Sequence, residues 1–141
     1  MNLRRSVTRA AVMLATIVSS VVMANPAQAS GGGCNDITQN NWHIGVCSGD
    51  DGVHMYPDYY INAAAPYSGT CVSRSRVDVY QYQRLVEYTG WATAGCANGH
   101  YTRPSVKIQG RSSSLEFRTR VQISVNGRTV YNALGPATKC C

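Results

Sequence analysis

The chain has 141 residues, with 13 lysines and arginines against 7 acidic residues, and 6 cysteines. This length accommodates one small domain after removal of an export signal, and it excludes two domains. No RNA- or DNA-binding motif is present, so we do not expect a nucleic-acid partner.

Residues 1–29 have the organisation of a cleavable export signal. Three arginines precede an apolar run of about 14 residues, and Ala27 and Ala29 form an Ala-x-Ala cleavage motif. The run is shorter than the roughly 20 apolar residues of a membrane-spanning helix. We therefore expect cleavage after Ala29 and a secreted, extracellular protein without membrane contact. An uncleaved anchor is the alternative.

Charge is unevenly distributed over the remaining residues, 30–141. They keep ten lysines and arginines against seven acids, which leaves a net charge of +3. Residues 30–73 hold four aspartates and no lysine or arginine, whereas residues 74–141 hold all ten basic residues and three acids. This asymmetry predicts either a basic binding face or two halves that attract each other within one fold.

The first part of this domain shows little regular pattern. Residues 30–33, one serine and three glycines, predict a flexible arm, because glycine runs lose much conformational entropy on ordering. Gly, Asn, Asp and Pro recur through residues 34–70, which predicts an irregular N-terminal half. We expect at most one short helix there, over residues 58–65.

Strand patterns dominate the second part. Residues 77–82, 85–88, 91–94 and 105–109 read as short strands, two of them with clear alternation of apolar and polar residues. Short strands at this spacing, with many Tyr, Thr and Val residues, predict a mainly β domain. We expect a small antiparallel β-sandwich or barrel-like sheet over residues 34–141, stapled by disulfides.

The clearest element is a hairpin that begins at residue 115. Apolar side chains and Thr119 occupy alternate positions over residues 115–125, and Asn126-Gly127 follows as the preferred pair for a type I′ turn. A two-residue loop would place Ile123 opposite Val130 on the buried face and Gln122 opposite Tyr131 outside.

The cysteines predict disulfides rather than a metal site. An even number in a small exported chain is typical of a disulfide framework, and no close C-x-x-C spacing is present. A bond between adjacent cysteines is strained, so we expect the C-terminal pair to reach two different partners. We also expect one bond at least between the irregular half and the sheet. The six are Cys34, Cys47, Cys71, Cys96, Cys140 and Cys141.

Catalytic machinery is not evident. His43, His54 and His100 are candidates for acid–base work, but no nucleophile motif accompanies them, and Asp50-Asp51-Gly52 lacks the spaced ligands of a calcium loop. We therefore expect a non-catalytic protein with no metal and no cofactor.

Basic and aromatic side chains are the candidate binding groups. Arg118 and Arg120 face outward on the predicted hairpin, and Arg103, Lys107 and Arg111 are candidates to extend a cationic strip. The alternative is a solvated face that protects the sheet edge. Tyrosines near residue 59 predict either a binding surface or part of the core. The candidate binding residues are Ser30, Gly31, Gly32, Gly33, Tyr59, Tyr60, Arg118 and Arg120.

An Ala-x-Ala signal, a glycine-rich arm and a small cystine-rich β domain together resemble the adaptor subunit of the umbrella toxin particles secreted by filamentous bacteria. The resemblance implies a bridge between a lectin-like subunit and the stalk of a large antibacterial toxin chain. It also implies that residues 30–33 enter a cleft of a partner.

Two other functions fit the sequence. An extracellular protease or glycosidase inhibitor would present a rigid disulfide-held loop, for which residues 71–76 and 96–100 are candidates. A small secreted hydrolase is the third possibility.

Overall fold

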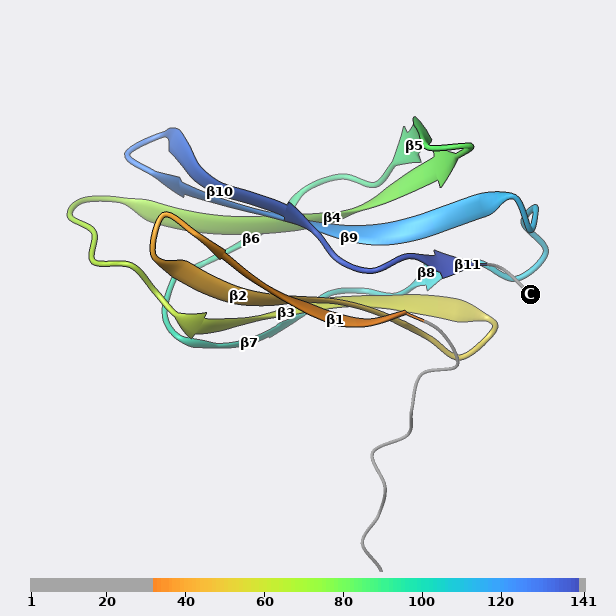
Figure 1. Cartoon of the computed structure of the whole chain (residues 1–141), viewed down its shortest axis with the longest axis horizontal. Coiled ribbons are helices and arrows are strands. Elements are labelled where there is room, and N and C mark those ends of the chain that lie inside the picture. Colours follow the sequence, from red (N-terminus) through yellow and green to blue (C-terminus); the bar gives the residue numbers. More distant parts are fainter. Residues whose placement is uncertain (1–31, 140–141) are drawn as a thin grey trace, which may run out of the picture.

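The computed structural model describes residues 32–139, and every regular element among them is a β-strand (Figure 1). The strands form two antiparallel sheets that lie one above the other, so the expected mainly β, sandwich-like domain is confirmed. Accordingly, the described residues include no helix with the length and hydrophobicity for crossing a membrane. The expected signal at residues 1–29 lies outside this part of the chain.

The first sheet has the strand order β1-β2-β3-β7, with β8 paired to another stretch of β3. The second has the order β10-β9-β4-β5, with β6 paired to β4 and β11 paired to β9. The strands are β1 (Gly32–Gln39), β2 (Trp42–Asp50), β3 (His54–Ala63), β4 (Cys71–Gln81), β5 (Arg84–Tyr88), β6 (Ala92–Ala94), β7 (Gly99–Thr102), β8 (Val106–Lys107), β9 (Leu115–Val125), β10 (Arg128–Leu134) and β11 (Thr138–Lys139).

The core lies between the sheets and follows the period-two alternation of their strands. On β9, every second residue from Phe117 to Ile123 is buried, and the residues between them face outward. Ile44 and Ile61 of the first sheet belong to the same buried cluster as Ile123. Phe117 belongs to a second cluster near the other end of the sandwich.

The expectation of an irregular N-terminal half is wrong, because β1, β2 and β3 form a regular antiparallel meander there. Their apolar residues do alternate: Ile44 and Val46 are buried on β2, as are Tyr59 and Ile61 on β3. Most of the interspersed Gly, Asn and Asp residues occupy the alternate positions or the turns, whereas Asp50 is buried at the end of β2. The expected helix over residues 58–65 is also wrong, because most of this segment belongs to β3.

The predicted glycine arm is partly built into the first sheet. Gly32 and Gly33 begin β1 opposite Gly49 and Ser48, while residues 30–31 lie outside the described part of the chain. Gly32 has φ = 81°, and a Cβ placed on it would lie 1.5 Å from the Ser48 carbonyl oxygen. Only glycine fits this backbone contact.

The predicted hairpin is confirmed, but its register is not. Asn126 and Gly127 both have positive φ angles, 50° and 79°, as a type I′ turn requires. A bulge between Thr129 and Tyr131 then places Tyr131, rather than Val130, opposite Ile123. Tyr131 is consequently buried, contrary to the expected register.

Two disulfides account for four of the cysteines. Cys34–Cys47 joins directly opposed residues of β1 and β2, and Cys71–Cys96 joins the start of β4 to the loop after β6. The second bond joins Cys71, at the border of the expected irregular half, to Cys96 of the second half, but in the structure both ends belong to the second sheet and its loops. Because these four residues pair with one another, the prediction that the C-terminal pair bonds to two of them is wrong. Cys140 and Cys141 lie outside the described residues.

The charge asymmetry of the sequence becomes an asymmetry between the two sheets. Strands of the first sheet carry three aspartates against Lys107, whereas strands of the second carry seven arginines and lysines against three acids. The sheets meet through apolar inner faces, so the charges lie mainly on opposite outer faces or at the rims.

Candidate functional site

The outer face of the second sheet is built around a buried carboxylate between two arginines. Arg76 on β4 and Arg120 on β9 are directly opposite in the strand register. Asp78 accepts a hydrogen bond from the Nε of each, at 2.6 Å and 2.5 Å, and its side chain is fully buried. The carboxylate therefore screens two cations that would otherwise repel each other across the strands.

Arg120 is held by further polar partners on the same face. It donates to Asn132 Oδ1 at 2.9 Å and to the Tyr80 hydroxyl at 2.9 Å. Burial lowers the pKa of Arg120, but the hydrogen bonds and charges of Asp78 and Tyr80 outweigh it, and the pKa lies above its usual value. The guanidinium thus stays charged and fixed in position.

Aromatic rings extend this face toward β5 and β6. The guanidinium carbon of Arg76 lies 4.3 Å from the ring centre of Tyr88 and 4.6 Å from that of Trp91. Arg74 also lies 4.6 Å from the Trp91 ring and donates two hydrogen bonds to Gln122 Oε1. The result is a layer of guanidinium groups stacked on aromatic rings. Arginines and aromatic residues contribute much of the binding energy at protein interfaces.

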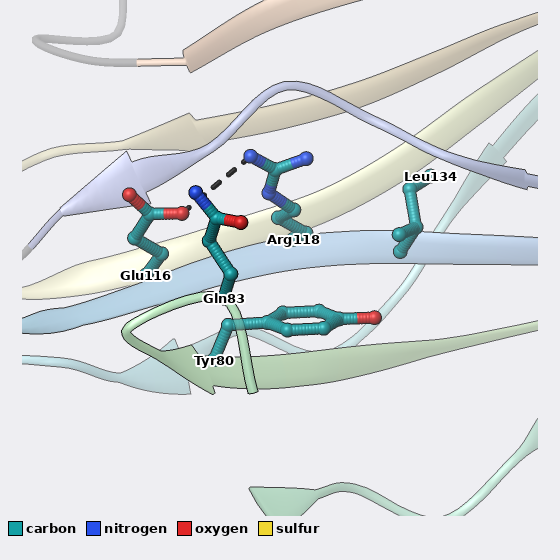
Figure 2. Close-up of a pocket in the computed structure, with 5 residues that line it drawn as sticks. All are labelled: Tyr80, Gln83, Glu116, Arg118 and Leu134. Atoms are coloured by element: carbon teal, nitrogen blue, oxygen red, sulfur yellow. Dashed lines mark hydrogen bonds and ion pairs between the residues drawn. The ribbon is translucent and has the colours of Figure 1, made fainter. Parts of the chain in front are cut away.

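A shallow pocket lies at the other end of the same face. It has a volume of about 260 Å³, and Figure 2 shows the side chains that line it. Arg118 forms an ion pair with Glu116 at 3.5 Å, and Glu116 also contacts Lys139 at 3.4 Å. Tyr80, Gln83 and Leu134 complete the lining. Polar and apolar groups therefore meet in a hollow suited to a protruding side chain of a partner.

The hairpin of β4 and β5 borders this pocket and is unusually apolar at its surface. Tyr82, at the turn, is 85% exposed, and Tyr88 is 61% exposed. Leu85 and Val86 are also exposed, on the edge strand β5. A group of exposed large apolar side chains on one projecting element is typical of a protein interaction site.

The turn of this hairpin has a strained backbone conformation. Tyr82 and Gln83 have φ angles of 49° and 65°, in the left-handed region that glycine and asparagine prefer. The backbone is therefore strained where it places a tyrosine at the tip of the hairpin. Strained backbone conformations are more common at functional sites than elsewhere.

Replacing Gln83 by glycine is expected to raise the free energy of unfolding by about 0.5–1 kcal/mol, because glycine adopts a positive φ without a steric penalty. Urea unfolding monitored by tryptophan fluorescence measures the change. The Gly127→Ala variant, at a turn residue with φ = 79°, provides the opposite control and should lose stability. A destabilised Gln83→Gly protein would contradict the assignment of strain.

The structure separates the other predicted binding residues. Arg118 and Arg120 lie on the outer face described above. Tyr59 is fully buried, stacks on Tyr101 and hydrogen-bonds Ser73 at 2.6 Å, so it belongs to the core. Its burial raises the pKa of its hydroxyl, partly offset by Ser73 and a nearby arginine. Tyr60 lies on the outer face of the first sheet, 4.1 Å from the His100 ring.

The wider cationic strip does not form as expected. Lys107 belongs to the first sheet, Arg103 hydrogen-bonds Ser75 between the two sheets, and Arg111 forms an ion pair with Glu87. These residues extend from different elements because the segment from β7 to β9 crosses from the first sheet to the second. The alternation of residues within a single strand does not reveal such a crossing.

The histidines lie in the first sheet beside carboxylates. His100 Nε2 is 2.9 Å from Asp58 Oδ2, and His43 Nε2 is 3.9 Å from Asp36 Oδ1. Both histidines and Asp36 are exposed, and Asp58 is partly exposed. Within residues 32–139, no group of three or more His, Cys, Asp or Glu side chains is placed to hold a metal ion.

The acidic segment at residues 50–52 spans the last residue of β2 and the start of the turn before β3. Asp51 accepts hydrogen bonds from the Tyr56 hydroxyl at 2.6 Å and from two backbone N–H groups. These bonds, that of Tyr56 foremost, lower the pKa of Asp51 to about 2. Its oxygens are thus occupied by the turn itself.

Sequence reasoning missed the β4–β5 hairpin as a candidate site. The available signal was a tyrosine between two glutamines, followed by Leu85, Val86 and Tyr88 within one short strand. The chain matches no protein-family model, and comparisons with curated proteins and with solved structures also give no match.

Proposed function

We propose that this chain is a secreted, non-catalytic binding protein that docks a protein partner on the outer face of its second sheet. The observation that carries the proposal is the projecting hairpin with exposed Tyr82, Leu85 and Val86 beside the pocket at Arg118. Aromatic residues and arginines dominate the binding energy of protein interfaces, and both are gathered on this face.

Within this proposal, the chain is the adaptor of an extracellular antibacterial toxin complex. The resemblance to the adaptor subunit of umbrella toxin particles supports a role between a lectin-like subunit and a large toxin chain. A bridging subunit needs two separate faces, and this sandwich offers a basic face and an acidic face.

Removing the apolar tip tests the proposal. The double variant Tyr82→Ala/Val86→Ser is expected to weaken partner binding at least 30-fold, because loss of an interface hot spot costs about 2 kcal/mol or more. Tagged protein would be purified from the culture medium of the native host. Co-purifying chains are identified by mass spectrometry, and affinity is then measured by surface plasmon resonance.

Tyr67→Ala is the matched control. Tyr67 is also exposed, but it stacks on Trp42 and lies outside the proposed face, so its removal should leave binding unchanged. Elution of the wild-type protein as a lone monomer of about 12 kDa would contradict the adaptor function. Equal binding by wild type and the hairpin variant would contradict the proposed face.

Inhibition of an extracellular hydrolase is the second candidate, favoured by the same hairpin. A rigid, protruding turn with one exposed side chain is the form in which many inhibitors contact an enzyme cleft. Residues 71–76, one of the two candidate inhibitor loops, do not form a loop, because they lie within the central strand β4. Slowed hydrolysis by trypsin- or subtilisin-like proteases, lost in Tyr82→Ala, would favour this function.

A further inference from the structure

A second recess lies at the edge of the sandwich where β4 and β6 of the second sheet approach the segment after β7. Ser75 and Val77 of β4 line it, together with Ala92 of β6 and Pro104 and Val106 from the segment after β7. Its volume is about 280 Å³, and most of its lining is apolar. We call this recess the edge groove.

One arginine lines the edge groove without a carboxylate partner. Arg103 donates from Nε to Ser75 Oγ at 2.9 Å and from Nη2 to the Tyr59 hydroxyl at 3.4 Å. No acidic side chain of residues 32–139 forms an ion pair with Arg103. The guanidinium carbon lies 5.8 Å from the centre of the Tyr59 ring, which carries no net charge, so the positive charge of Arg103 is available to an anionic ligand.

The Arg103 guanidinium is held in position by a buried chain of hydrogen bonds. Tyr59 hydroxyl and Ser73 Oγ are 2.6 Å apart, and Ser73 donates to the Gly95 carbonyl at 2.6 Å. A guanidinium has five N–H groups, and these contacts use two of those on Arg103. The three that remain, on Nη1 and Nη2, match the two oxygens of a carboxylate.

We propose that the edge groove binds the C-terminal residue of a partner polypeptide. Its terminal carboxylate pairs with the free N–H groups of Arg103, and its apolar side chain lies among Val77, Ala92 and Val106. The groove is smaller than the roughly 300 Å³ at which pockets for drug-sized ligands begin, so it suits one residue. A chain terminus carries a carboxylate and an apolar side chain on the same residue, whereas an internal Asp or Glu offers the carboxylate alone.

This groove is a different surface from the outer face proposed above. Arg76 contributes to both, but its Nε is already hydrogen-bonded to Asp78. Each proposal can therefore fail without affecting the other, because partner binding by the hairpin variant and ligand binding in the edge groove are measured in separate experiments.

Titration with two small analogues of a chain terminus tests the proposal. N-acetyl-leucine has the terminal carboxylate, and N-acetyl-leucinamide replaces it by a neutral amide. Amide resonances of Ala92 and Val106 in the ¹⁵N-labelled secreted protein should shift saturably with the acid. N-acetyl-leucinamide should bind at least tenfold more weakly than N-acetyl-leucine, since a charge-assisted hydrogen bond contributes about 1.5–3 kcal/mol.

Variants and further ligands make the outcome specific. Arg103→Met should remove the preference for the acid, while Arg128→Met, at an exposed arginine of β10, should keep it. Acetate should bind more weakly than N-acetyl-leucine, because it lacks the apolar group. Equal binding of acid and amide by the wild-type protein, or no saturable binding up to about 50 mM, would overturn the proposal. Tighter binding of N-acetyl-aspartic acid α-amide, whose only carboxylate is that of the side chain, would also overturn it, in favour of an internal acidic side chain.

Discussion

Replacing Asp78 by alanine is expected to lower the free energy of unfolding by about 3–5 kcal/mol. Asp78 is fully buried and hydrogen-bonds both Arg76 and Arg120, which lie directly opposite each other on adjacent strands. Its loss leaves two partly buried cations in repulsive contact. Equilibrium unfolding in urea, followed by tryptophan fluorescence, measures the loss.

A second substitution shows whether repulsion is the cause. In the Arg120→Met background, Asp78→Ala should cost markedly less, because only one unpaired arginine remains. Glu87→Ala removes the partner of Arg111 at an exposed site and should cost less than about 1 kcal/mol. If Asp78→Ala cost as little as Glu87→Ala, the role of Asp78 as the link between the two strands would be wrong.

Removing the Cys71–Cys96 disulfide is the second change for which we expect a large effect. The Cys71→Ser/Cys96→Ala variant should lose about 3–4 kcal/mol, because this bond spans 25 residues and restricts the unfolded chain accordingly. Cys96 is also part of the buried cluster, so the loop after β6 would lose its attachment to the core. Thermal and urea unfolding of the oxidised proteins measure this loss.

The other disulfide provides the comparison. Cys34–Cys47 spans 13 residues and joins neighbouring strands that a short turn already holds together. Its removal in Cys34→Ser/Cys47→Ala should therefore cost less, by several tenths of a kcal/mol or more. A larger loss for this variant would indicate that the edge strand β1, rather than the loop after β6, limits stability.

The sequence predicted the second sheet well and the first sheet poorly, for identifiable reasons. Residues 115–125 alternate without interruption, so both the strand and its buried face could be inferred. In β2, glycines at positions 45 and 49 interrupt the polar positions of the alternation. In β3, Pro57 and three tyrosines obscure the pattern, because tyrosine occupies buried and exposed positions alike.

The bulge near Val130 was not predictable from alternation. One extra residue in β10 reverses the faces of all residues after it, and Tyr131 fits either face by composition. The bulge becomes apparent only when the core is assembled and the ring of Tyr131 fills space beside Ile123.

The candidate site was predicted in part. Arg118 and Arg120 were placed on an outward face because their own strand alternates. The hairpin tip was missed because exposure of Leu85 and Val86 depends on β5 lying at the edge of its sheet, which is a property of the topology. Tyr59 was a candidate for binding or core, and its place in the first sheet decides for the core.

The separation of charge between the two sheets makes the molecule an electric dipole whose axis crosses the sandwich. A neutral molecule of this shape would approach a charged surface in any orientation. With this separation of charge, the basic sheet would turn toward a negatively charged surface and the acidic sheet toward a positively charged one before contact. Such orientation would begin at a distance of about a Debye length, roughly 8 Å at physiological salt, before any side chain makes contact.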